Sequence, residues 1–308
     1  MWKEPLKMAR RLSPAITLIA SAAIVGLALS ACGSDSLTTP GAGATTPLAT
    51  QTKEASLADR LPAKIKAAGK IVVGTDATYA PNEFLDADGK TVIGWDVDLF
   101  NAVAQKFGVT VVWQPAKFDS IIIGVNSGKF DVGVSSFTIN DKRKTQVNMV
   151  GYYNAGTQWA AAPGNPKKVD PLKPCGLKVA VQKATVQADE DLPAKVKACA
   201  ATGKPLDVQV YDGQDQATAA VASGKADAML ADSPVVGYAI KQSAGKIEAV
   251  GDVYDAAPYG YVLPKSEADF AQALVDALKS LDSSGDYKKV LGIWGAEAGA
   301  ISDFAVNP

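Results

Sequence analysis

The sequence predicts an α/β protein with two lobes, each a mixed, mostly parallel sheet flanked by helices, and a ligand cleft between them. From residue 71, short apolar runs alternate with amphipathic stretches, which is typical of βαβ units. The alternation restarts after Pro163 and so indicates a second lobe. Residues 32–308, which follow a predicted leader, are enough for two compact lobes. A cleft between lobes is a preferred place for a small ligand.

The first lobe begins with a buried strand at 71–74. An amphipathic helix is expected at 96–108, because apolar residues recur every three or four positions and Gly108 is a suitable helix stop. A strand, a short helix and another strand follow at 109–113, 120–127 and 131–134.

After Pro163 the pattern predicts three further strands, at 177–181, 208–211 and 226–230. The helices expected between and after them lie at 186–200, 215–223 and 234–242. A last strand at 259–263 and a long amphipathic helix at 268–281 complete the body of the chain.

The first 31 residues predict an export signal. Basic residues precede an uncharged apolar run from Ala15 to Leu29, which is shorter than the ~20 residues of a membrane-spanning helix. The sequence LSAC at 29–32 resembles the lipobox of bacterial lipoproteins, in which Cys32 would be lipidated and become the mature N-terminus. The alternative is an ordinary signal peptide with a chance cysteine. We therefore expect export and a lipid anchor on the outer face of the bacterial cytoplasmic membrane.

Composition predicts a flexible tether after the signal and excludes several functions. Residues 32–60 are largely Ser, Thr, Gly, Ala and Pro at their start, without an apolar period. The net charge is −1, which gives no basic face for nucleic acid, and there is no histidine for a catalytic triad or a usual zinc site. Cys175 and Cys199 form an even pair in an oxidising compartment and predict a disulfide, two free thiols being the alternative.

Seven ordered blocks resemble the extracellular solute-binding proteins of the polar amino-acid class (family 3), which serve ATP-driven importers of bacteria. They are GTDATYAPNEF at 74–84, GWDVDL at 94–99, SSFTINDKR at 135–143, QKATV at 182–186, ADSP at 231–234, PYGYV at 258–262 and the C-terminal stretch 287–295. The resemblance implies a type II periplasmic-binding-protein-like fold in which the chain crosses between lobes twice. We place the crossings near 155–160 and 254–257, so that lobe 1 holds 61–157 plus 257–308 and lobe 2 holds 158–256.

Two charged residues suit the two ends of an α-amino acid. Arg143 can bond both carboxylate oxygens, and Asn140 is a plausible N-cap of a helix whose start would also attract the carboxylate. Asp232 follows a predicted strand, at the edge where open α/β folds bind ligands, and would hold the ammonium group. Taken alone, Arg143 also fits a solvated surface charge, and Asp232 also fits an N-cap for the helix that follows.

The resemblance assigns the remaining contacts. It implies that the backbone carbonyl of Ser136 accepts from the ligand ammonium and that the hydroxyl and amide of Thr138 donate to the ligand carboxylate. Thr185 and the amide of Val186 would close on the ligand from lobe 2. Tyr79 and Phe118 would be aromatic walls, with core packing as the alternative for Phe118, and Asp76 would favour an amide or cationic ligand side chain. The implied ligand set is Asp76, Tyr79, Phe118, Ser135, Ser136, Thr138, Arg143, Thr185, Val186 and Asp232.

Two positions depart from the pattern of the family. Ala184 stands where glycine is common, and Asn82 stands where an aromatic residue is common. We expect a monomeric binding protein without cofactor or metal that captures a polar amino acid and delivers it to a membrane permease. The alternatives are a sensor for a membrane kinase and a cyclohexadienyl-dehydratase-like enzyme. The enzyme would need a general acid, for which Asp76 is a candidate without a second clearly placed acid.

Overall fold

The computed structural model describes residues 49–308, so the predicted signal, Cys32 and the first part of the predicted tether lie outside the described residues. The last part of that tether differs from the prediction. Two short helices, α1 (Ala55–Ala58) and α2 (Ala63–Ala68), open the body of the protein. Leu57 is buried in the main hydrophobic cluster, and Lys106 donates to Glu54 at 3.1 Å. Arg60 also pairs with Asp269 and Asp276, so a buried leucine and several ion pairs fasten a segment that shows no apolar period in the sequence.

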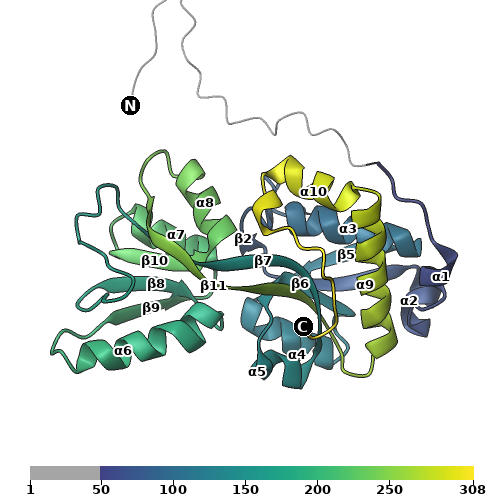
Figure 1. The fold of residues 1–308 in the computed structure, drawn as a ribbon, viewed down its shortest axis with the longest axis horizontal. Helices are drawn as coiled ribbons and strands as arrows, with labels where there is room; N and C mark the ends of the chain where they lie inside the picture. The colour runs from purple at the N-terminus through teal and green to yellow at the C-terminus, as the bar shows by residue number, and fades with distance from the viewer. Residues whose placement is uncertain (1–48) are drawn as a thin grey trace, which may run out of the picture. The chain divides into compact units, whose positions relative to one another are not determined.

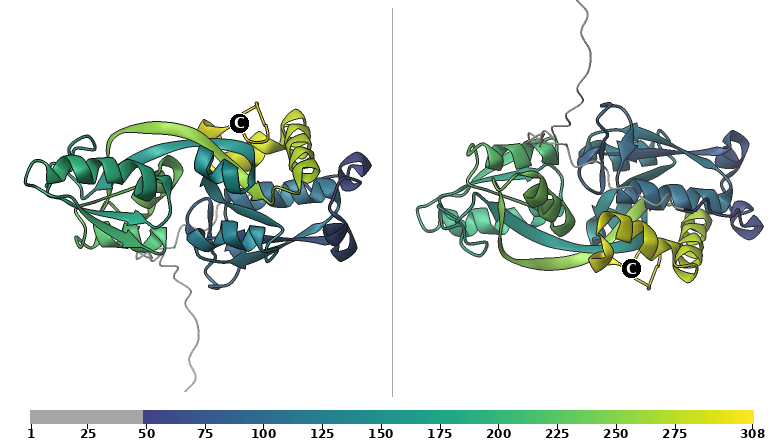
Figure 2. Two further views of the ribbon diagram at one scale, coloured as in Figure 1. Left: turned by 90° about the horizontal axis from the view of Figure 1, so that it is seen from below. Right: turned by 90° about the horizontal axis from the view of Figure 1, so that it is seen from above.

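One eight-stranded sheet runs through both lobes, in the order β5-β1-β6-β11-β7-β10-β8-β9. It is continuous because the long antiparallel strands β7 (Asn148–Ala161) and β11 (Glu248–Leu263) belong to both lobes. Figures 1 and 2 show these two strands passing together between the lobes. Both stretches where the sequence places a chain crossing lie within them.

Each lobe adds three strands with parallel pairing to the antiparallel pair β7 and β11. In lobe 1, β1 pairs in parallel with two neighbours, and the three strands are β1 (Lys70–Thr75), β5 (Thr110–Pro115) and β6 (Val132–Thr138). In lobe 2, β8 pairs in parallel with two neighbours, and the three strands are β8 (Lys178–Gln182), β9 (Asp207–Tyr211) and β10 (Ala228–Asp232). A small antiparallel sheet of lobe 1 holds β2 (Thr78–Tyr79), β3 (Glu83–Leu85) and β4 (Val92–Ile93).

Helices cover both faces of the sheet in lobe 1 (Figure 1). The largest hydrophobic cluster packs one face against α3 (Trp95–Phe107), α9 (Ala268–Ser283) and α10 (Asp286–Trp294). A second cluster packs the other face against α4 (Phe118–Asn126), which is followed after β6 by α5 (Asp141–Gln146). Helix α3 ends at Gly108, whose φ of 72° is the left-handed conformation that a C-terminal glycine adopts readily. A short 3₁₀ turn, η2 (Glu297–Gly299), follows α10.

Lobe 2 has the same layered arrangement with two smaller clusters. One packs against α7 (Gln214–Ala222) and α8 (Ser233–Gln242), and the other against α6 (Leu192–Ala200). The helix predicted at 186–200 begins as a π-helical turn, η1 (Gln187–Asp191), before it becomes α6. Pro193 lies in the first turn of α6, where a missing N–H costs little.

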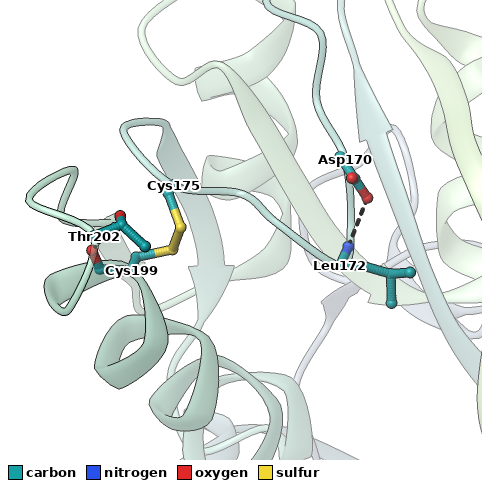
Figure 3. The surroundings of a disulfide bond; sticks show 5 residues. All are labelled: Asp170, Leu172, Cys175, Cys199 and Thr202. Carbon is teal, nitrogen blue, oxygen red and sulfur yellow. Dashed lines mark hydrogen bonds between the residues drawn. A yellow bond between two sulfur atoms is a disulfide. The ribbon is translucent and has the colours of Figure 1, made fainter.

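The predicted disulfide between Cys175 and Cys199 is present and joins the chain before β8 to the end of α6 (Figure 3). A cross-link that closes a loop of this length stabilises a fold by ~2–4 kcal/mol. Among the helices of residues 49–308, none has the length and apolar character needed to cross a membrane.

Candidate ligand-binding site

All ten predicted ligand residues line one pocket between the two lobes, together with Gln182 and Gln187, which were not predicted as ligand residues. Lobe 1 supplies residues from the ends of β1 and β6 and from β2, α4 and α5. Lobe 2 supplies the turn after β8 and the end of β10. The space left among these side chains is about 10 Å³, roughly enough for one water molecule. The described conformation is therefore closed, and a larger ligand enters only when the lobes separate.

Asp232 is the last residue of β10 and lies wholly inside the pocket. Its carboxylate accepts hydrogen bonds from the hydroxyl groups of Tyr79 at 2.8 Å and Tyr259 at 2.7 Å, and from the side-chain amide of Gln187 at 2.7 Å. It makes no side-chain capping bond to α8, so the capping alternative does not hold. Burial raises the pKa of Asp232 above its ordinary value, although the three donors and Arg143 oppose the shift. Tyr259 was not among the predicted site residues, although it lies in the PYGYV block.

Arg143 is buried beside the pocket rather than solvated. The predicted N-cap is confirmed, because the Asn140 side chain accepts from the Arg143 backbone N–H at 2.8 Å. The guanidinium donates to the carbonyl of Thr138 at 2.7 Å and, across the lobes, to the carbonyl of Ala184 at 3.0 Å. Burial lowers the pKa of Arg143, and the charge of Asp232 acts in the opposite direction. A guanidinium stays charged under such conditions.

Phe118 serves both as a pocket wall and as part of the core, so the two interpretations hold together. Its ring stacks on Phe137 with centroids 4.6 Å apart, and the guanidinium carbon of Arg143 lies 5.4 Å from the centroid of each ring. Aromatic faces attract a cation at this distance. The two rings therefore help to hold the arginine in place.

Asp76 follows β1 directly and connects the two lobes. Its carboxylate accepts from the backbone N–H of Phe118 at 2.9 Å and from the hydroxyl of Thr78 at 2.7 Å. The side-chain amide of Gln182, in lobe 2, donates to the same carboxylate at 3.0 Å. Burial raises the pKa of Asp76, and the hydrogen bond from Thr78 opposes the shift most strongly. The signal for Gln182 was its place at the start of the QKATV block.

The turn after β8 closes the pocket from lobe 2. The Thr185 hydroxyl donates to the carbonyl of Gln182 at 2.8 Å, which holds the turn in shape. Ala184 has a φ of 62°, in the left-handed region that favours glycine. This conformation explains why glycine is common at that position in the family that the sequence resembles. The π-helical turn that begins at Gln187 then brings its side chain to Asp232.

The pocket contains one cation and two carboxylates, from Arg143, Asp76 and Asp232. This charge set suits a ligand that carries both an anionic and a cationic group. Within residues 49–308, no three histidine, cysteine, aspartate or glutamate side chains come together as a metal site.

Residues 71–297 match the family of bacterial extracellular solute-binding proteins, family 3. The match spans most of the chain, and the protein therefore belongs to this family, as its sequence blocks predicted. Members of the family are extracellular, in agreement with the predicted export.

Particular relatives cover most of the same region. The chain is 37% identical over 248 residues to the arginine-binding protein ArgT of Corynebacterium glutamicum, a match that covers 80% of this chain and 81% of that protein. An ancestral arginine-binding protein bound to arginine has a similar structure, with a TM-score of 0.65 and 32% identity over 73% of this chain and 98% of its own. An ancestral amino-acid-binding protein, a precursor of cyclohexadienyl dehydratase, is also similar in structure. Its TM-score is 0.66 and its identity 32%, and the match covers 75% of this chain and 97% of that protein. These likenesses confirm the predicted two-lobed, type II fold.

Proposed function

We propose that this protein is the substrate-binding component of an ABC importer, that it binds a cationic amino acid, with arginine as the first candidate, and that it delivers this ligand to the permease. The observation that carries the proposal is the charge of the pocket. Arg143 is opposed by two buried carboxylates, Asp76 and Asp232, which leaves one excess negative charge. Because unpaired buried charges are costly, such a site is best matched by a ligand with a net charge of +1. The arginine-binding relatives support the same ligand class.

Each charged group of an arginine ligand has a partner in this proposal. The ligand carboxylate replaces a backbone carbonyl as acceptor for Arg143, which now donates to Thr138 and Ala184. The α-ammonium pairs with Asp232 and replaces donors that now occupy its oxygens. The side-chain cation pairs with Asp76. These exchanges require opening about the paired strands β7 and β11, after which the ligand favours the closed form.

The surrounding assembly is part of the same proposal. Lipidation at Cys32 would anchor a monomer outside the cytoplasmic membrane, with the tether allowing lobe 1 (61–157 plus 257–308) and lobe 2 (158–256) to reach the permease. A Cys32→Ser variant should lose its acyl chains and appear in the medium or remain attached only by an uncleaved signal. Recovery of acylated Cys32→Ser protein in the membrane fraction would contradict the anchor.

The deciding experiment is a calorimetric titration of the exported protein with all twenty amino acids and with citrulline. Citrulline has nearly the shape of arginine but a neutral side chain, so it isolates the charge argument. We expect arginine to bind at least tenfold more tightly than citrulline and Asp76→Asn to remove most of that difference. Equal affinities would overturn the cationic preference, and binding of no amino acid would overturn the proposed function.

An enzymatic role is the second candidate, because one similar structure is a precursor of cyclohexadienyl dehydratase. A dehydratase needs a general acid free to reach the leaving hydroxyl. The Asp76 carboxylate instead accepts hydrogen bonds from three residues in the closed pocket. Incubation with cyclohexadienyl substrates and a search for the dehydrated product tests this candidate, and we expect no turnover.

A further inference from the structure

Ser136, in the pocket wall, adopts a backbone conformation that serine rarely takes. Its φ is 52°, in the left-handed region where a side chain costs about 1–2 kcal/mol. The neighbouring strands do not hold it there. Strand β6 pairs with β1 only at Val132 and Gly133, and its register with β11 is interrupted between Gly133 and Phe137. Some other contact must therefore stabilise the strained residue.

Two buried side chains of the loop before β3 and of β3 itself hold the hydroxyl of Ser136. The hydroxyl accepts from the side-chain amide of Asn82 at 2.9 Å and donates to one carboxyl oxygen of Glu83 at 3.1 Å. The other oxygen of Glu83 accepts from the Ser135 hydroxyl at 3.2 Å, and that hydroxyl accepts from the backbone N–H of Asp76 at 2.9 Å. Asn82 and Glu83 are both 0% exposed. The pair thus fixes two consecutive serines of the pocket wall.

Asn82 is itself oriented by Trp95. The indole N–H of Trp95 donates to the side-chain carbonyl of Asn82 at 2.7 Å. Since an indole only donates, this bond leaves the amide nitrogen of Asn82 facing Ser136. Trp95 is 0% exposed, so its N–H needs a buried acceptor. This pairing gives a physical reason for a polar residue at position 82, where the resembled family commonly has an aromatic one.

Asp96 is a buried neighbour of Glu83. Both carboxyl groups are 0% exposed, and the hydroxyl of Tyr152 donates to one oxygen of Asp96 at 2.6 Å. The other oxygen of Asp96 has no hydrogen-bond partner among the described residues. Burial and the neighbouring Asp96 raise the pKa of Glu83 well above its ordinary value, while burial raises the pKa of Asp96 to about 7. Two neighbouring buried carboxyl groups repel each other when both are ionised, which adds to the effect of burial on Glu83.

We propose that Asn82 and Glu83 are positioning residues of the ligand site, which hold Ser136 in its strained conformation and so preserve the pocket wall that meets the ligand ammonium. This inference rests on the proposed function, because it concerns the same site. Neither residue lines the pocket. Their removal should therefore weaken ligand binding without deleting a ligand contact, by letting the segment 134–137 relax.

The first test measures arginine affinity by calorimetry in variants that distinguish the bond of Asn82 to Ser136 from its bond to Trp95. Asn82→Leu removes both of its side-chain hydrogen bonds and should weaken binding at least tenfold. Trp95→Phe removes only the bond that orients Asn82 and leaves the amide able to reach Ser136, so it should weaken binding less than Asn82→Leu does. The double variant Asn82→Leu/Trp95→Phe discriminates between roles. If Asn82 served only to satisfy Trp95, the double variant would recover parental affinity. We expect it to stay as weak as Asn82→Leu.

Glu83 offers a matched conservative pair. Glu83→Gln keeps the shape of the side chain and polar atoms that can hydrogen-bond both serine hydroxyls, and its affinity should remain within about threefold of the parent. Glu83→Leu keeps the volume but neither polar atom and should lose at least tenfold. Equal losses in the two variants, or loss in neither, would contradict the role of Glu83. Where a leucine variant does not fold, Ser136→Ala replaces it, because that variant removes only the held hydroxyl, and we expect the same tenfold weakening.

A second measurement needs no ligand and separates this inference from the proposed function. Hydrogen exchange of the unliganded protein, read on peptides that contain residues 134–137, should be at least tenfold faster in Asn82→Leu and Ser136→Ala. Peptides of lobe 2 should exchange as in the parent. If the parent binds no amino acid, the proposed function is wrong, but the exchange rates of the variants still test whether Asn82 and Glu83 position Ser136. Unchanged exchange in both variants would overturn it.

Discussion

The guanidinium of Arg143 donates a 3.0 Å hydrogen bond to the backbone carbonyl of Ala184, across the two lobes of the protein. The same guanidinium donates to the carbonyl of Thr138 within its own lobe. One buried cation is thus satisfied by backbone from both lobes in the closed conformation. A carboxylate is a stronger acceptor for a guanidinium than a neutral carbonyl, so an anionic ligand group displaces these contacts favourably.

The proposed salt bridges with the ligand make both charged anchors costly to remove. We expect Arg143→Ala and Asp232→Ala each to weaken arginine binding by ~2–5 kcal/mol, because each leaves a ligand charge unpaired in a closed pocket. Ligand titrations measure the loss, with melting temperatures to confirm folding. Lys142→Ala is the control, since Lys142 is exposed one residue away and its 3.7 Å pair with Asp189 of lobe 2 is a surface pair, which contributes ~0–1 kcal/mol. Parental affinity in Arg143→Ala would rule out an amino-acid site of this kind.

Reciprocal ion pairs at the rim of the cleft should make closure depend on salt. Lys117 of lobe 1 pairs with Asp212 of lobe 2 at 2.5 Å, and Lys183 of lobe 2 pairs with Asp119 of lobe 1 at 2.7 Å. Three of these four side chains are exposed and Asp119 is half-buried, so salt screens both pairs. We expect added salt to open the unliganded protein, as measured by small-angle scattering. Lys117→Glu should open it at low salt, and adding Asp212→Lys should restore closure. A radius of gyration that is the same in all three proteins would contradict this role.

The fold was predictable where the sequence carries a periodic signal. Helix α3 has a repeating apolar face and a glycine stop, and its predicted and observed limits differ by one residue at each end. Strand β11 was predicted only at 259–263, although it begins at Glu248. Its first half is mostly exposed and contains Asp252 and Asp255, so it has no alternating pattern. Pairing with β7 alone makes it a strand, and such pairing is a tertiary contact.

The site was predictable only in part, where its residues lie in sequence blocks that match the family. Residues inside the matching sequence blocks were identified, and the structure brings all ten to one pocket. Contacts that depend on closure were not predictable, because Gln182 reaches Asp76 only when the lobes meet. The link from Trp95 through Asn82 to Ser136 was hidden for a related reason, since its members lie far apart in sequence.

Acid should weaken the binding of a cationic ligand. Burial raises the pKa of Asp76 and of Asp232 above the ordinary value of 3.8, so the unliganded folded protein binds protons more tightly than the unfolded chain. The stability that these groups contribute is therefore fully present below pH 3.8 and is lost as the pH rises through the raised pKa values. A cationic ligand has the opposite preference, because it needs both carboxylates ionised.

We expect the rise in melting temperature caused by arginine to shrink as the pH falls from about 7 to about 4. The decline should start above the ordinary carboxylate range. Asp76→Asn should bind more weakly at neutral pH and lose less on acidification, since one of the two titrating groups is gone. A ligand-induced shift that stays constant over this range would show that neither carboxylate pairs with the ligand.

The strained turn of lobe 2 gives a test of stability in which the usual effect of glycine is reversed. Ala184 has a φ of 62°, and glycine adopts that conformation without steric cost. We expect Ala184→Gly to raise the free energy of unfolding by about 0.5–1 kcal/mol, measured by denaturant titration. Ala198→Gly is the control, because Ala198 is exposed within α6, where glycine should lower stability by about 1 kcal/mol. The carbonyl that accepts from Arg143 is retained in Ala184→Gly. Destabilisation of both variants alike would show that the left-handed turn stores no strain.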